Sequence, residues 1–385
     1  MNQWQKAKNI LCIRLDAMGD LLMSTPAIKH LKEAVPGRKI TLLTSKEGSY
    51  IAPAIGLFDE VITYSAPWLK SSENKNDPSD DYLMIKNLKE LKFDGAVIFT
   101  VYSQNPLPTA LLCYLSEIPL RAAYCRENPY GLLSDWIKEE EPHTFLRHEV
   151  RRHLDLVEKL TSQIIKDSPL VLNINPSAQD SLLTKIHKEG VSKNEFENMV
   201  LVHPGSTASS RRFHTAGFAE VCDLLVKSRK KVLFTGTESE SHLVTDITSK
   251  MPSGHETVNL SGKLSLEELI ALIGLAPVLI SNNSGPVHIA AAVGTPVVDI
   301  YALTNPQHTP WMVKHSLLFH EVSCAYCYKS TCPLDHNNCI NLVSPQKIFQ
   351  ETLALLNLKV SMRRDETAVV PILLKEDFNY GHTRK

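Results

Sequence analysis

The residues that most clearly could bind a ligand lie in one stretch, residues 281–298. An apolar strand ends there and leads into a turn of small polar residues, Ser-Asn-Asn-Ser-Gly at 281–285. Ser284 is a suitable N-cap, Pro286 stands in a first turn, where helices tolerate proline, and Gly294 can end the helix. Such a helix start presents free backbone N–H groups and about half a positive charge. The stretch predicts a phosphate or diphosphate site, although a turn that binds nothing has the same pattern.

A second group of residues that could bind a ligand or react is a cluster of cysteines near the C-terminal end. It consists of Cys324, Cys327, Cys332 and Cys339, with His336 among them. In a cytosolic chain such a cluster indicates zinc or an iron–sulfur cluster before disulfides. The spacing is not that of a common zinc finger, so reduced structural cysteines or a redox-sensitive pair remain alternatives.

Two similar α/β halves are expected to position these groups. Short apolar runs separated by helical patterns predict parallel sheets that helices cover on both faces. Turns after such strands gather at the carboxyl edge of the sheet, so we expect them to line a cleft between the halves. The predicted strands are 10–14, 39–43, 60–64 and 95–99 in the first half, and 199–203, 231–234, 277–280 and 297–301 in the second. The lining turns are 16–20, 205–206, 235–238 and 282–285.

The overall composition narrows the class of protein. The chain has 385 residues, enough for two domains, and a formal net charge of -1, which does not favour nucleic-acid binding. No stretch approaches the ~20 apolar residues of a membrane span, and the N-terminus has no apolar signal core. We therefore expect a cytoplasmic protein, with peripheral contact to the inner membrane left open.

Five sequence blocks occur in a characteristic order. They are Ile-Arg-Leu-Asp-Ala-Met-Gly-Asp at 13–20 with Thr-Pro-Ala at 25–27, His-Pro-Gly-Ser at 203–206 with Arg-Arg-Phe at 211–213, Thr-Gly-Thr-Glu at 235–238, Leu-Ser-Gly at 260–262, and 281–296. In these blocks the chain resembles glycosyltransferase family 9, the ADP-heptose:lipopolysaccharide heptosyltransferases, over about residues 9–357. The cysteine segment, with Cys332-Pro333 and His336, also resembles a segment of many members.

The resemblance implies an α/β GT-B fold, with two Rossmann-like domains whose parallel sheets face each other across a central cleft. Residues 1–172 would form the N-terminal acceptor-binding domain and 173–345 the C-terminal nucleotide-sugar-binding domain. A late helix at 346–357 would return to the N-terminal domain, and 358–385 would form a tail. The implied reaction is inverting transfer of a heptose from an ADP-sugar donor to a lipopolysaccharide core or Kdo–lipid A acceptor.

On this resemblance Asp20 is the expected general base, because Met18-Gly19-Asp20 matches the block that holds the family's catalytic aspartate. Deprotonation of the attacking hydroxyl by a carboxylate contributes about 10²–10⁴-fold in rate. The structural alternative is a first-turn aspartate stabilised by the helix dipole. Asp16 is the less favoured base, because relatives often carry serine there. The resemblance places Arg14, Met18 and Gly19 at the acceptor.

The expected donor site combines the helix start with nearby turns and cations. Arg211 matches a position where relatives present a cation to the phosphates, whereas Asn283 replaces the aspartate of many relatives and removes a charge. His288 could instead pack in the core, Glu238 could be a polar turn residue, and either arginine could have a surface role. The predicted nucleotide-sugar-binding residues are Ser206, Arg211, Arg212, Thr237, Glu238, Asn283, Ser284, Gly285 and His288.

Other functions and cofactors have weaker support. The absence of an Asp-x-Asp triplet argues against a divalent metal that bridges the nucleotide, so no cofactor is expected to be required, apart from possible zinc or iron–sulfur at the cysteines. The absence of Gly-x-Gly-x-x-Gly disfavours an NAD-dependent oxidoreductase. The alternatives are a transferase of the same family with another nucleotide sugar, or a non-catalytic metal-bearing binding protein on this scaffold.

Overall fold

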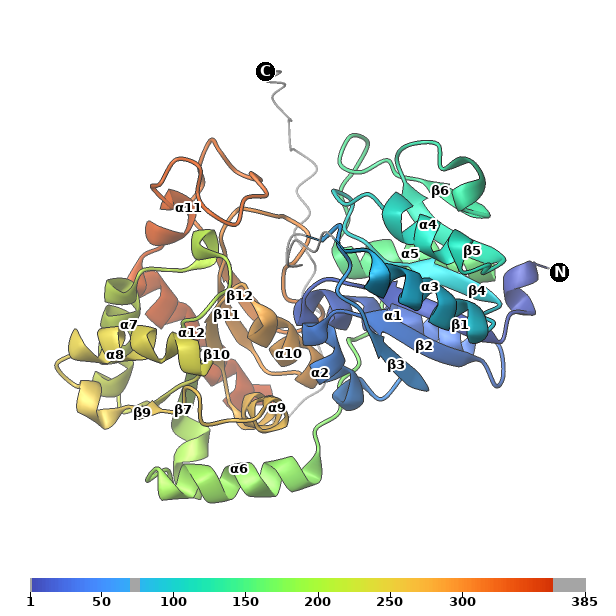
Figure 1. Cartoon of the computed structure of the whole chain (residues 1–385). Coiled ribbons are helices and arrows are strands. Elements are labelled where there is room, and N and C mark those ends of the chain that lie inside the picture. Colours follow the sequence, from blue (N-terminus) through green and yellow to red (C-terminus); the bar gives the residue numbers. More distant parts are fainter. Residues whose placement is uncertain (1, 70–76, 363–385) are drawn as a thin grey trace.

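The structure, a computed structural model, describes residues 2–69 and 77–362. Within these residues the chain forms two α/β halves, each built on a parallel six-stranded sheet with helices against it (Figure 1). The predicted tail lies outside the described residues from 363 onward.

The first half contains the sheet β3-β2-β1-β4-β5-β6. Because β2 and β4 flank β1 on opposite sides, the strand order reverses at β1, and α/β sheets bind ligands at the carboxyl end of such a switch point. Its strands are β1 (Asn9–Arg14), β2 (Lys39–Thr44), β3 (Glu60–Thr63), β4 (Gly95–Ile98), β5 (Leu120–Cys125) and β6 (Asp135–Lys138). Its helices are α1 (Met18–Glu33), α2 (Lys46–Ile55), α3 (Ser79–Glu90), α4 (Leu107–Leu115) and α5 (Glu149–Thr161), with the short 3-10 helices η1 (Gln3–Gln5) and η2 (Tyr130–Leu132).

The second half repeats this plan with the sheet β12-β11-β10-β7-β8-β9, whose order reverses at β10 and β7. Its strands are β7 (Met199–His203), β8 (Lys231–Phe234), β9 (Val258–Asn259), β10 (Leu279–Asn282), β11 (Val297–Ile300) and β12 (His315–Leu318). Its helices are α6 (Pro176–Lys188), α7 (Thr215–Lys227), α8 (Ser241–Ser249), α9 (Leu266–Leu275), α10 (Gly285–Val293), α11 (Asn338–Asn341) and α12 (Pro345–Met362). The 3-10 helices are η3 (Lys193–Asn198), η4 (Ser209–Arg211), η5 (Glu238–Glu240) and η6 (Gly254–Glu256).

Local sequence signals explain where several of these helices begin and end. Ser265 and Glu268 form the predicted capping box at the start of α9. Gly294 ends α10 with φ 79°, the left-handed conformation that glycine adopts at low cost. The predicted late helix also forms, as α12.

The late helix does not take the place that the sequence suggested. Residues 346–357 were expected to return to the N-terminal domain, but α12 packs against α7, β11 and β12 of the second half. Ile348, Leu355 and Leu356 are buried in the same hydrophobic cluster as Phe218 and Val221 of α7. Burial of this apolar face against α7 therefore decides the position of the helix.

The two halves are joined by a continuous apolar contact. Leu21 and Leu22 of α1 belong to the same buried cluster as Val287 and Ile289 of α10. The chain passes from one half to the other near Asn173, whose backbone N–H donates to Ala54 O at 2.8 Å. Helix α6 then packs along α9. In the described part of the chain, no helix is long and apolar enough to span a bilayer.

Candidate active site

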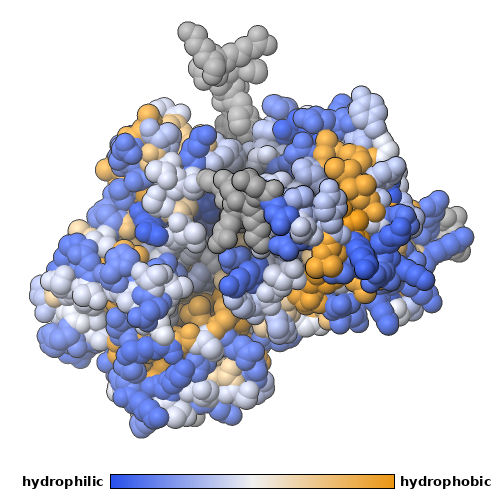
Figure 2. Space-filling model, in the orientation of Figure 1, coloured by the Kyte–Doolittle hydropathy of each residue, from blue (hydrophilic) through white to orange (hydrophobic). Residues whose placement is uncertain are grey.

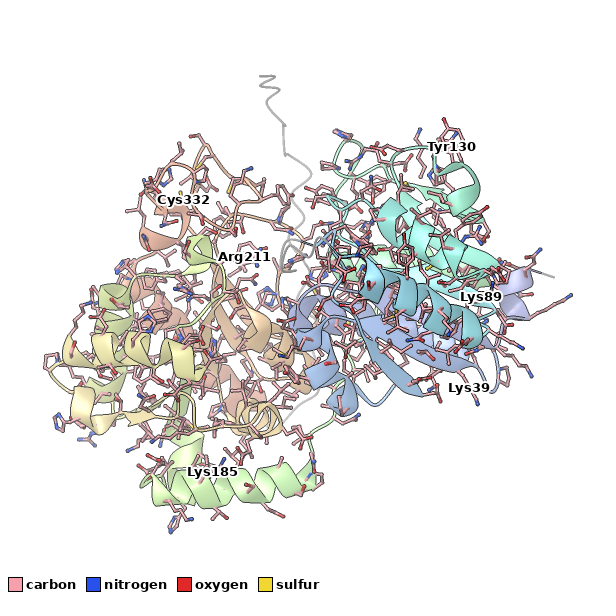
Figure 3. All side chains as sticks on the ribbon, in the orientation of Figure 1. Lys39, Lys89, Tyr130, Lys185, Arg211 and Cys332 are labelled. Carbon is pink, nitrogen blue, oxygen red and sulfur yellow. The ribbon has the colours of Figure 1, made fainter. Side chains whose placement is uncertain are left out.

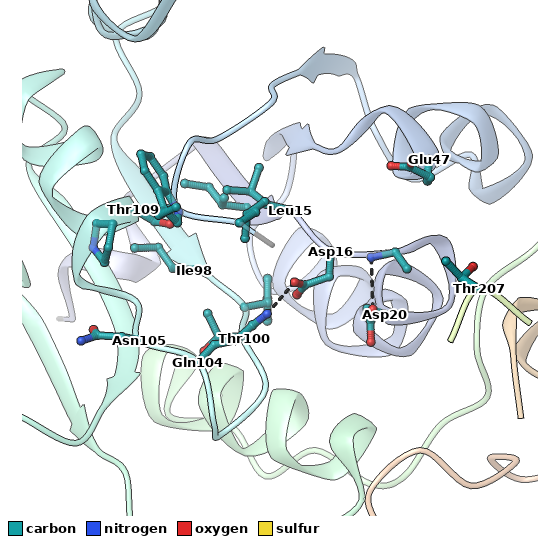
Figure 4. A pocket seen from close by; sticks show the side chains of 16 residues that line it. Leu15, Asp16, Asp20, Glu47, Ile98, Thr100, Gln104, Asn105, Thr109 and Thr207 are labelled. Carbon is teal, nitrogen blue, oxygen red and sulfur yellow. Dashed lines mark hydrogen bonds between the residues drawn. The ribbon is translucent and has the colours of Figure 1, made fainter. Parts of the chain in front are cut away.

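A pocket of about 630 Å³ opens at the carboxyl edge of the first sheet (Figure 4). Its walls come from the turn after β1, the turn after β4, the start of α2, and Thr207 of the second half. The polar lining residues are Asp16, Asp20, Glu47, Thr100, Gln104, Asn105, Thr109 and Thr207. Of the residues predicted for catalysis or acceptor binding, only Asp20 lines this pocket.

Two interactions fix the carboxylate of Asp20. Its Oδ2 accepts a hydrogen bond from the backbone N–H of Ala17 at 3.1 Å, which caps the start of α1. Its Oδ1 lies 3.4 Å from Arg14 Nη2. The structural alternative, a first-turn aspartate that stabilises its helix, is therefore also true of this residue. Both roles are compatible, because a carboxylate has more lone pairs than these two interactions use.

A second aspartate lies beside Asp20 in the pocket. Asp16 Oδ1 accepts from Gln104 Nε2 at 2.6 Å, drawn as a dashed line in Figure 4, and Oδ2 pairs with Arg14 Nε at 3.1 Å. Burial raises the pKa of Asp16, although Arg14 and Gln104 oppose this effect. Both oxygens of Asp16 are thus held by cationic or amide donors.

Arg14 was expected to contact the acceptor, but its side chain lies elsewhere. Its side chain is fully buried and lies behind the two aspartates. Nη1 lies 3.1 Å from Glu149 Oε1, and the same oxygen lies 2.9 Å from His153 Nε2. Arg14 therefore orients carboxylates, because solvent and substrate do not reach it.

Glu149 and His153 belong to the site although they were not among the predicted residues. Both are fully buried on α5. Burial opposes ionisation of Glu149, but the charges and hydrogen bonds of His153, Arg14 and Arg152 lower its pKa. Burial lowers the pKa of His153. The spacing of four residues within a helix was the only available signal, since it places both side chains on one face.

The start of α1 touches the start of α10 across the two halves. A β-carbon built on Gly19 would lie 2.7 Å from His288 Cδ2, and one on Gly285 would lie 2.8 Å from Met18 Cε. Glycine at both positions allows this close approach. Burial lowers the pKa of His288 to about 3, so its ring is neutral and packs at the contact. Met18 and Gly19, predicted at the acceptor, lie in this contact.

The turn before α10 leads into a helix as predicted, and hydrogen bonds of its own side chains fix its conformation. Asn283 is buried, and its Nδ2 donates to Asp299 Oδ2 at 2.8 Å and to His308 O at 2.9 Å. Burial raises the pKa of Asp299 to about 8. Ser284 is the N-cap residue of α10, as predicted, but its hydroxyl donates to Asn282 O instead of capping the helix. The helix start therefore has no side-chain cap.

The two predicted arginines differ in their surroundings. Arg212 Nε donates to Ser206 O at 2.6 Å, so Arg212 fixes the turn that contains the buried Ser206. Arg211 is half-buried, and no side-chain hydrogen bond or ion pair engages its guanidinium among the described residues. Its charge acts on the buried groups Asp299 and His288, which places it near the start of α10 (Figure 3). The guanidinium of Arg211 is thus available to an anionic ligand.

Thr237 and Glu238 are exposed on the turn after β8. Glu238 contacts Gly262, where a β-carbon would lie 1.9 Å from Glu238 Oε2. Glu240, which was not among the predicted residues, accepts from the Thr237 backbone N–H at 2.9 Å and approaches Gly205 closely. The Thr-x-x-Glu spacing of a capping box was a signal for it.

All four clustered cysteines are free and half-buried. Cys324, Cys327 and Cys332, the last labelled in Figure 3, precede α11, and Cys339 lies within it. Cys324 Sγ lies 3.8 Å from His336 Nε2, and the other three cysteines act on the pKa of Cys339. Among the described residues, no three His, Cys, Asp or Glu side chains are arranged to hold a metal ion. Zinc or iron–sulfur at this segment stays a prediction, for which metal analysis of protein purified under reducing conditions is the test. The site described above involves none of these cysteines.

The family model of glycosyltransferase family 9 (heptosyltransferase) matches residues 82–338. This match spans more than half of the chain, so the chain belongs to glycosyltransferase family 9 and is a glycosyltransferase. Lipooligosaccharide heptosyltransferase 2 of Haemophilus influenzae is 25% identical over 308 residues, which cover 78% of this chain and 85% of the relative. The protein of the same name from Campylobacter jejuni is 24% identical over 343 residues, 88% and 95% of the two chains.

Solved structures confirm the predicted GT-B fold. The family 9 glycosyl transferase of Veillonella parvula superposes with a TM-score of 0.75 at 19% identity, over 91% of this chain and 97% of the other. ADP-heptose LPS heptosyltransferase II of E. coli gives 0.71 at 20% identity, over 91% and 99%. E. coli heptosyltransferase WaaC with ADP-2-deoxy-2-fluoro heptose gives 0.63 at 16% identity, over 90% and 99%.

Proposed function

We propose that this glycosyltransferase moves a heptose from ADP-heptose to a lipopolysaccharide inner-core acceptor, with inversion at the anomeric carbon and Asp20 as general base. One observation carries the proposal. The turn that holds Asp20 and the uncapped start of α10 touch each other through the pairs Gly19–His288 and Met18–Gly285. The proposed base, Asp20, and the proposed diphosphate site, the start of α10, therefore lie on the two sides of the contact between α1 and α10.

The proposed reaction follows from this placement. The acceptor hydroxyl, seated in the pocket beside Asp20, gives its proton to the carboxylate and attacks the anomeric carbon from the face opposite ADP. The new C–O bond forms while the bond to the diphosphate oxygen breaks, and ADP keeps that electron pair. Backbone N–H groups at the start of α10 and the cation of Arg211 stabilise the charge on the leaving group. Arg14 holds the base in position from behind.

Names of relatives support the choice of donor and acceptor. The solved neighbours include E. coli ADP-heptose LPS heptosyltransferase II and E. coli heptosyltransferase WaaC with ADP-2-deoxy-2-fluoro heptose, and the relatives of similar sequence are named for lipooligosaccharide. An acceptor with a lipid anchor implies peripheral contact with a membrane. The exposed side chains Leu111, Tyr114 and Leu115 of α4 fit this part of the proposal, because Pro108 and Thr109 of the same helix line the pocket. Figure 2 shows apolar residues gathered in this region of the surface.

The test is an ADP-release assay with a panel of sugar nucleotides and truncated core acceptors. We expect ADP-heptose to be the best donor and release to depend on the acceptor. Faster release from another nucleotide sugar would change the donor assignment. No acceptor-dependent release from any donor would overturn the proposed transferase reaction.

A further inference from the structure

One loop of the second half reaches into the first half. It joins β11 to β12, residues 301–314, and its Gln307 is fully buried. Gln307 Nε2 donates to Arg147 O at 2.9 Å and to Glu141 Oε1 at 3.3 Å. Its backbone O accepts from the backbone N–H of Glu149 at 3.2 Å. A single residue of the second half therefore holds the start of α5 and the segment before it.

The start of α5 also fixes the proposed base. Glu149 Oε1 lies 3.1 Å from Arg14 Nη1, and Arg14 Nη2 lies 3.4 Å from Asp20 Oδ1. Gln307, Glu149 and Arg14 are all fully buried, so water does not replace a partner that one of them loses. The position of Gln307 is thus linked to that of Asp20 through two intervening residues.

The same loop is tied to the proposed diphosphate site. Asn283, in the turn before α10, donates to the backbone O of His308, the residue after Gln307, at 2.9 Å. The loop is also braced internally, because Asn305 Oδ1 accepts from the Gln307 backbone N–H at 2.8 Å. A chain of bonded neighbours therefore joins the turn before α10 to Asp20, in addition to the contact between α1 and α10.

On the basis of the proposed function, we infer that Gln307 is a positioning residue for the transfer reaction. It does not line the pocket beside Asp20. It holds Glu149, and through Glu149 and Arg14 it holds the carboxylate of Asp20. The base of the first half is thus kept in place by the second half, which carries the donor site, so proton removal depends on the docking of the two halves.

Amide hydrogen exchange tests this inference without a substrate. The backbone N–H of Ala17 donates to Asp20 Oδ2, so its exchange rate reports how firmly that carboxylate is held. Gln307→Met keeps the length of the side chain but removes its hydrogen bonds. We expect the Ala17 amide to exchange about threefold to tenfold faster in this variant, as the loss of a net hydrogen bond implies.

Two controls separate this effect from a general loosening. The backbone N–H of Ser265 is held by Glu268 in the same way at the start of α9, and its exchange should not change. Gln350→Met, at an exposed glutamine of α12, is the matched variant and should leave the Ala17 amide as in wild type. If Gln307→Met does not fold, Asn305→Ala replaces it, because it frees the Gln307 backbone N–H and should act in the same direction.

The reaction supplies a second measurement. Gln307→Met should lower kcat about tenfold and leave the ADP affinity unchanged, since a misplaced catalytic group can cost up to about 10²-fold in rate. A double-mutant cycle with Asp20→Asn shows whether this loss acts through the base. In the Asp20→Asn background no carboxylate remains to be positioned, so Gln307→Met should lower the residual rate by less than about twofold.

The outcomes distinguish this inference from the proposed reaction. Unchanged exchange at Ala17 in Gln307→Met, or an equal loss of rate with and without Asp20→Asn, would overturn the inference even if the enzyme transfers heptose. Equal acceleration at Ser265 and Ala17 would overturn it as well. Faster exchange confined to Ala17, without ADP release from ADP-heptose, would support the hold of Gln307 on Asp20 and contradict the proposed reaction.

Discussion

Gly19 lies against the ring of His288, so that the first turns of α1 and α10 meet through this ring and through Met18, which lies against Gly285. A β-carbon on Gly19 would be only 2.7 Å from His288 Cδ2. This contact joins the residue before Asp20 to the helix whose start we assign to the diphosphate. The distance between base and leaving group is therefore set by how closely these two turns approach.

Gly19→Ala should destabilise the protein by about 1–3 kcal/mol and lower turnover, because the added methyl group must displace the buried His288 ring. Alanine is the better helix former, so local helix propensity acts in the opposite direction. Urea denaturation and the ADP-release rate would measure both effects. Gly131→Ala is the control, since a β-carbon there has no atom within 4 Å. Full stability and rate in Gly19→Ala would show that the contact is unimportant.

Asp20→Asn should lower kcat by about 10²-fold or more and leave ADP affinity unchanged, because it removes the proton acceptor but keeps the side-chain shape. Steady-state kinetics and calorimetric titration with ADP would measure the two quantities. Asp16→Asn is the comparison variant, because Gln104 and Arg14 already occupy both oxygens of Asp16. A larger loss of kcat in Asp16→Asn than in Asp20→Asn would make Asp16 the base.

Arg211→Gln should weaken ADP binding by about tenfold, since a charge-assisted contact to phosphate is lost. The wild-type affinity should also fall with added salt more steeply than that of the variant. Arg229→Gln, at an exposed arginine just after α7, is the control for a general change in charge. Equal affinities of wild type and Arg211→Gln would remove Arg211 from the site.

Glu149→Gln should cost about 3 kcal/mol of stability, because it breaks a buried ion pair and leaves Arg14 with fewer partners. The turnover should also fall, since Arg14 holds Asp20. Glu90→Gln provides the comparison, because the Lys86–Glu90 pair is exposed and 4.0 Å long. Chemical denaturation of both variants measures the difference, and similar small losses would contradict a structural role for Glu149.

Acid should weaken the contact between the halves through buried histidines. Burial lowers the pKa of His148 to about 4 and of His288 and His308 to about 3, from a usual value of 6.5. Histidines with a depressed pKa stay neutral in the folded protein. Their contribution to the free energy of unfolding is therefore complete above pH 6.5 and is lost as pH falls toward 4. From pH 7.5 to 5.5 each of the three histidines should contribute a loss of about 1 kcal/mol to the free energy of unfolding, whereas Asp299, whose pKa burial raises to about 8, should contribute a gain over the same range.

Denaturation curves at several pH values would measure this loss. The free energy of unfolding of wild type should fall by about 1 kcal/mol relative to that of His308→Gln between pH 7.5 and 5.5, because the variant lacks one titrating histidine. A pH dependence that is the same in both proteins would show that His308 does not stay neutral at low pH.

The sequence by itself determined the repeated α/β plan and several local features. The apolar runs predicted β1, β2, β7, β8, β10 and β11, because central parallel strands are buried on both faces. The predicted strands did not include β5 (Leu120–Cys125) or the edge strands β6 and β12, where polar residues interrupt the apolar pattern. The turn before α10 was identified from the chemistry of consecutive residues, and the block around Asp20 from its resemblance to glycosyltransferase family 9.

Only the tertiary structure decided which distant residues meet. Arg14 and Glu149 are 135 positions apart, and no local pattern could show that one orients the other. The same holds for Gly19 with His288, for Trp68 and Glu47 at the pocket, and for the packing of α12 on α7 instead of the first half. Helix starts and strand runs follow from neighbouring residues, whereas burial, charge pairing and domain contact depend on how the two sheets pack together.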